Sequence, residues 1–122
     1  MQFETLTVNG TEYNLKISAR NACLLEESIG CSIVDGLQRL TQISVLSEYY
    51  FRALFGHNDS VKKKDDVFTI FDEYIICGGT YDELQAKMLE ALVASGILAK
   101  EAADAVKNLK TKQKDAFEKL SK

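Results

Sequence analysis

The feature that most constrains this chain is an Asn9-Gly10 pair between two short segments of alternating apolar and polar residues. Asn-Gly is the strongest short-range signal for a two-residue β-turn, because both turn positions need a positive φ. Such a loop pairs Val8 with Thr11, Leu6 with Tyr13 and Glu4 with Leu15. This register places one apolar face on the hairpin, made of Leu6, Val8, Tyr13 and Leu15. Two strands alone are marginal in water, so helices are expected to cover this face.

The rest of the sequence predicts helices, and the absence of proline leaves their ends to other residues. Ser18, Ser32 and Thr80 are candidate N-caps, and Thr80 begins a T-x-x-E capping box. Glycines at 30, 56, 78–79 and 96 separate the apolar-periodic segments. We expect helices over about 19–29, 33–40, 45–55, 65–77, 81–95 and 98–120. The predicted fold class is α+β, mostly α, with an N-terminal β-hairpin packed on a bundle of about five to six helices.

Charge divides the chain into two parts. Residues 1–99 hold 8 Lys/Arg and 14 Asp/Glu, whereas residues 100–122 hold 7 Lys and 4 Asp/Glu. We expect residues 1–98 to form the hairpin and helical core, and residues 99–122 to form a basic C-terminal helix or tail. The first half of this tail should dock, and the part after the KTKQK break at 110–114 should fray or project. A basic tail on an acidic body favours contact with an acidic surface, such as its own body.

Several classes of function and location are disfavoured by what the sequence contains. The formal net charge of −3 argues against nucleic acid as the main partner. No run of 18 apolar residues is present, and residues 1–20 lack the apolar region of a signal peptide, so we expect a cytosolic protein with no membrane contact. The odd number of cysteines, without a CxxC, does not predict a disulfide framework.

No residue pattern predicts catalysis, a metal or a cofactor. His57 lies in the polar segment 56–64 without a Cys or acidic partner at a ligand spacing. Adjacent carboxylates such as Glu26-Glu27 point about 100° apart on a helix, so they are better explained as solvated faces than as an acid/base pair. The three cysteines, Cys23, Cys31 and Cys77, match no zinc-site spacing and are expected to be small core residues. We therefore predict a binding protein and not an enzyme.

The order of the signals resembles the tail assembly chaperones of long-tailed phages of Gram-positive bacteria. The segment FETLTVNGTEYNLKISARNACLLEESIG is similar to the family's N-terminal hairpin, "TVNGKEYKLRL", and the helix ending in Gly that follows it. The segment FDEYIICGGT, followed by YDELQAKMLEALVASGIL, is similar to the family's later turn into a helix. The resemblance covers about residues 3–98; the loop 56–64 and the basic segment 99–122 depart from it.

The resemblance implies a non-catalytic protein of the host bacterial cytoplasm that is absent from the mature virion. Members of this family hold the tape measure protein, which is long, helical and aggregation-prone, before tail tube protein polymerises around it. Many members have a frameshifted extension that recruits the tail tube protein, and several self-associate, so a homo-oligomer is a possible form. The family supplies no universal binding residues.

Holding a helical client requires an apolar groove that accepts an amphipathic helix. The helices expected at 45–55 and 67–75 are the candidate walls, because the first has aromatic residues on more than one side. Most of these aromatics should be core, and one or two left exposed would form an interaction patch. We expect the last helix to fill the groove in the free protein. The candidate client-binding residues are Tyr49, Tyr50, Phe51, Phe55, Phe71, Tyr74, Lys110, Lys112 and Lys114.

Two other classes remain open at this point. One is a head–tail connector or another structural protein of the virion. The other is a small regulator that binds nucleic acid through the Lys-rich tail, although the Lys62-Lys63-Lys64 run is more simply a solvated loop.

Overall fold

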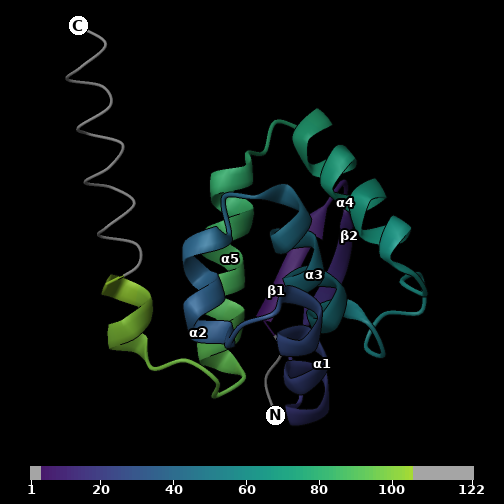
Figure 1. The fold of residues 1–122 in the computed structure, drawn as a ribbon. Helices are drawn as coiled ribbons and strands as arrows, with labels where there is room; N and C mark the ends of the chain where they lie inside the picture. The colour runs from purple at the N-terminus through teal and green to yellow at the C-terminus, as the bar shows by residue number, and fades with distance from the viewer. Residues whose placement is uncertain (1–3, 106–122) are drawn as a thin grey trace, which may run out of the picture.

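The hairpin predicted around Asn9-Gly10 is confirmed in a computed structural model, which describes residues 4–105 of the chain (Figure 1). Strands β1 (Glu4–Val8) and β2 (Thr11–Leu15) pair antiparallel in the expected register, from Val8 opposite Thr11 to Glu4 opposite Leu15. Asn9 and Gly10 have φ angles of 50° and 80°, as the turn requires. The apolar face is covered: Leu6, Val8 and Leu15 are buried and Tyr13 is half-buried.

The predicted fold class, α+β and mostly α, is confirmed. The helices are α1 (Ala19–Ile29), α2 (Ile33–Gly36), the 3-10 helix η1 (Leu37–Arg39), α3 (Ile43–Leu54), α4 (Lys64–Ile76) and α5 (Tyr81–Ala94). Residues 100–105 are also helical. The side chains of Ser18, Ser32 and Thr80 cap α1, α2 and α5 by accepting backbone N–H bonds. The helix expected over 33–40 is instead divided between α2 and η1.

Helix α3 is the centre of the core and contacts α1, α4, α5 and β2 (Figure 1). Tyr49 and Tyr50 are adjacent, fully buried and directed to different neighbours. The Tyr49 hydroxyl donates to the Ile33 carbonyl of α2 at 2.8 Å, and the Tyr50 hydroxyl donates to the Leu84 carbonyl of α5 at 2.6 Å. A Cβ at Gly36 would overlap the Tyr49 hydroxyl, so glycine is needed where α2 approaches α3.

The polar segment after α3 is a loop over residues 56–63, as expected, and it is anchored to the sheet. Asn58 accepts from the Asn14 N–H and donates to the Asn14 and Leu54 carbonyls, each at 2.9 Å. The Lys16 N–H donates to the Ala53 carbonyl, and His57 Nε2 donates to the Lys16 carbonyl at 3.1 Å. These bonds satisfy backbone groups at the outer edge of β2 that a two-stranded sheet would leave open. The side chain of Val61 adds an apolar anchor to the core.

The chain after α5 packs against the core as far as it is described. Leu98 and Ala103 are buried, in agreement with the expectation that the first half of the last helix docks. Residues 100–105 lie beyond α2 and α5 in Figure 1, on the opposite side of the molecule from α4. Residues 106–122 lie outside the described residues, and so do the predicted client-binding residues Lys110, Lys112 and Lys114. No helix within residues 4–105 has the length and apolar character needed to cross a bilayer.

Candidate binding surface

The groove expected between the aromatic helix and its neighbour is filled by the aromatic side chains themselves. The rings of Tyr50 and Phe71 meet edge to face, with centroids 5.2 Å apart, across the contact between α3 and α4. Tyr49, Tyr50 and Phe71 are all fully buried. Three of the predicted client-binding residues are therefore core residues. Tyr49 and Tyr50 are buried because α3 is enclosed by neighbours on several sides, and Phe71 because it lies on the side of α4 that packs against α3. In this conformation they are not accessible to a client.

Residues 100–105 do not lie in the expected groove either. They lie far from α4 in Figure 1, with α5 between them. The expectation that the last helix fills a space between the third and fourth helices therefore does not hold for its described part. The aromatic core of α3 and α4 already occupies that space.

Two of the predicted aromatic residues do lie at the surface, at the C-terminal end of α3. Phe55 is 41% exposed, and Phe51 is half-buried beside it, with ring centroids 5.3 Å apart. The guanidinium of Arg52 lies 5.1 Å from the centre of the Phe51 ring, within the range of a cation–π contact. This end of α3 presents two aromatic rings and a positive charge, which suits an apolar partner with acidic flanks.

Tyr74 is half-buried and holds the turn between α4 and α5. Its hydroxyl donates to Glu83 at 2.8 Å, and Glu83 also accepts from the Thr80 hydroxyl at 3.2 Å. Burial, followed by the hydrogen bond to Glu83, raises the pKa of Tyr74. A Cβ at Gly79 would overlap the Tyr74 ring, so the turn can close only over glycine. These contacts give Tyr74 a structural role, whether or not a client also touches it.

A surface that the sequence reasoning missed lies on the outer side of α4. Phe68 is 37% exposed and Ile76 is 82% exposed, although both are large and apolar. A signal for them was present, since the apolar stripe of this helix runs through Val67, Ile70, Phe71 and Tyr74 and leaves both residues out. Apolar residues outside the core-facing stripe of a helix are candidates for contact with a partner.

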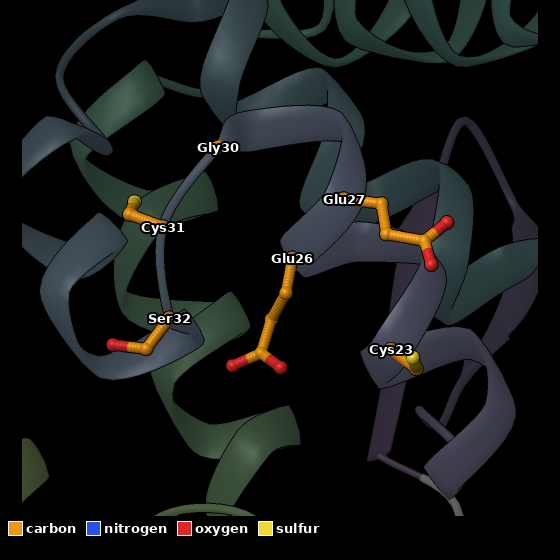
Figure 2. A pocket seen from close by; sticks show the side chains of 6 residues that line it. All are labelled: Cys23, Glu26, Glu27, Gly30, Cys31 and Ser32. Carbon is orange, nitrogen blue, oxygen red and sulfur yellow. The ribbon is translucent and has the colours of Figure 1, made fainter.

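An open hollow of about 400 Å³ lies between the end of α1 and the start of α2 (Figure 2). Glu26 points into it and accepts from the Ile33 N–H at 3.0 Å, so its carboxylate caps the next helix. Cys23 and Cys31 stand on opposite sides of the hollow in Figure 2, and Glu27 points away. Across residues 4–105, no three His, Cys, Asp or Glu side chains converge to hold a metal ion.

The expectation that the cysteines are small core residues is wrong for Cys23 and Cys77, whereas Cys31 packs against the edge of the core. Cys23 and Cys77 are exposed and Cys31 is half-buried. Cys23 lies on the outer side of α1. Cys77 comes directly after the end of α4, and Cys31 follows Gly30, which ends α1. The chain turns away from the core at these two ends, which leaves the thiols near solvent.

The Lys62-Lys63-Lys64 run leads into α4, of which Lys64 is the first residue. The N–H groups of Lys62 and Lys63 donate to an Asp66 oxygen at 2.9 and 3.0 Å, and these bonds lower the pKa of Asp66. Lys64 forms an ion pair with Glu48 of α3. Asp66, in the first turn of this helix, therefore acts as its cap.

Comparison with protein-family models, with curated proteins and with solved structures found no match to this chain.

Proposed function

We propose that this protein is a non-catalytic tail assembly chaperone of a long-tailed phage, which binds the tape measure protein in the host bacterial cytoplasm. The observation that carries the proposal is the ordered resemblance of residues 3–98 to that family, from the VNGTEYNL hairpin to the GGTYDEL turn. In this proposal the tail tube protein is a second partner, and the chaperone is absent from the finished virion.

The described surface supports binding to an apolar chain. Within residues 4–105, five large apolar side chains remain exposed: Val34, Ile43, Phe55, Phe68 and Ile76. The paired rings of Phe51 and Phe55 at the end of α3 can accept an apolar residue of a client helix. The client contact is thus assigned to Phe51 and Phe55, and not to the buried Tyr49, Tyr50 and Phe71.

The test is co-expression with the tape measure protein of the same phage, scored by the fraction of that protein that stays soluble. We expect the chaperone to raise this fraction and Phe55→Ser to lower it by several-fold. Val34→Ser is a matched control, because Val34 is 54% exposed on a different helix. A client that is equally insoluble with and without the chaperone would refute the proposal. Recovery of the chain in purified virions would instead select a structural role in the particle.

A further inference from the structure

We propose that the outer face of α4 is the docking site of the chain's own Lys-rich C-terminal segment, residues 106–122. This face, called the α4 face below, consists of Phe68, Asp72, Ile75 and Ile76. The proposal goes beyond the chaperone role and does not depend on it, because it concerns the protein without a client.

The α4 face is apolar at positions where an exposed helix is ordinarily polar. Ile76 points fully outward and is 82% exposed, the highest exposure among the large apolar side chains of residues 4–105. Phe68 is 37% exposed, and Ile75 is half-buried at the rim of the core. On a helix, residues 68, 72, 75 and 76 share one side at spacings of four, three and one. No described segment covers this side.

Charge complementarity identifies the occupant. Residues 65–86, which include α4 after its first residue and the start of α5, contain six Asp/Glu and no Lys or Arg. The first residue of α4, Lys64, is already paired with Glu48 of α3. None of these six carboxylates forms an ion pair with a cation in residues 4–105. Residues 106–122 contain six Lys against only Asp115 and Glu118. The most basic part of the chain therefore complements the part that has acidic groups and no basic ones.

The apolar pattern and the length of the segment also fit. Leu109, Ala116, Phe117 and Leu120 fall at helical spacing between the lysines, so the segment can present an apolar side with basic flanks. With residues 106–108 extended and residues 109–120 helical, the segment spans about 28 Å. A body of this size has a radius of gyration of about 13 Å. The segment can therefore reach the α4 face from the end of the described chain, although residues 100–105 and α4 lie on opposite sides of α5 (Figure 1).

The experiment uses the full chain with a nitroxide spin label on Cys77, which is exposed and follows Ile76 directly. Cys23 and Cys31 are changed to Ser so that only one thiol reacts. We expect amide NMR signals of residues 109–120 to lose at least half of their intensity, and to regain it in Ile76→Ser or Asp72→Lys. The same label on Cys23 of α1, in a Cys31→Ser/Cys77→Ser background, is the matched control and should leave these signals unchanged.

A second measurement avoids the label. In the unlabelled protein, Lys110→Gln/Lys112→Gln/Lys114→Gln should shift the amide signals of the α4 face and leave those of α1 unchanged. Undiminished tail signals with the Cys77 label, together with unshifted α4 signals in the Lys variant, would overturn the proposal. A mixing experiment gives a further way to overturn the proposal. If the tail signals of ¹⁵N protein without the spin label weaken when spin-labelled ¹⁴N protein is added, the segment binds a second copy and not its own α4 face. None of these outcomes bears on client binding, so failure here and failure of the chaperone role can be told apart.

Discussion

Replacing Asn58 by Ala tests whether the segment after α3 is a structural part of the sheet. Asn58 makes three hydrogen bonds of 2.9 Å to the backbone of Asn14 and Leu54. A net value of about 1 kcal/mol for each bond gives an upper figure of about 3 kcal/mol. The site is only half-buried, so water can replace part of this. We expect Asn58→Ala to lower the free energy of unfolding by about 2–3 kcal/mol, and the melting temperature by about 10 °C.

The assay is urea unfolding followed by far-UV circular dichroism, with Asp59→Ala as the control. Asp59 is the neighbouring residue, is exposed and makes no hydrogen bond in the described structure, so its change should stay within about 0.5 kcal/mol. If the two variants unfold at the same urea concentration, the argument that Asn58 completes the edge of β2 is refuted.

Asn58→Asp gives the same reasoning a pH dependence. A carboxylate keeps the acceptor for the Asn14 N–H but faces the Asn14 and Leu54 carbonyls without a proton to donate. The pKa of this Asp should be raised in the folded state above its ordinary value of about 3.9. Relative to wild type, the Asn58→Asp variant should therefore lose its full amount of stability at pH values above the pKa of this Asp in the folded state. It should regain that stability as the pH falls through this pKa. A variant whose stability relative to wild type does not change with pH would contradict the assignment of Asn58 Nδ2 as a double donor.

Three further predictions follow from buried groups, a tight turn and exposed thiols. Gly79→Ala should lower the free energy of unfolding by about 1–3 kcal/mol in urea titration, because the added Cβ would overlap the Tyr74 ring. Gly10→Ala is the comparison variant: its Cβ would meet open space, so it tests only the positive φ of the turn. Burial raises the pKa of Tyr49 and of Tyr50 above the ordinary 10.0, so these tyrosines ionise in the unfolded chain before they do in the folded protein. The free energy of unfolding should therefore fall above pH 10 by about 1.4 kcal/mol per pH unit for each tyrosine. Tyr49→Phe should reduce this slope, and an unchanged slope would contradict the burial of the Tyr49 hydroxyl. In the native protein, a thiol reagent should modify Cys23 and Cys77 rapidly and Cys31 more slowly, as read by mass spectrometry of the time course; equal rates for all three would contradict their different exposure.

Local signals in the sequence determined the elements of this fold. The Asn9-Gly10 turn fixes the hairpin register, because the conformation of two residues sets every pair after it. The caps at Ser18, Ser32 and Thr80 lie where the structure begins the corresponding helices, because a capping side chain bonds to N–H groups only two or three residues away. Each of these interactions is contained within a short segment, so a reading of that segment alone predicts it.

The tertiary structure alone decided which apolar side chains are buried. Helix α3 carries aromatic residues on several sides, and only the positions of α2, α4 and α5 place Tyr49 and Tyr50 inside and Phe55 outside. The role of Asn58 depends on Asn14, which is 44 residues away, so no local pattern indicates it. Phe68 and Ile76 are exposed because no described segment crosses their side of α4. Burial is a property of the neighbours that surround a side chain, and long-range packing sets those neighbours, whereas turns and caps require only the adjacent residues.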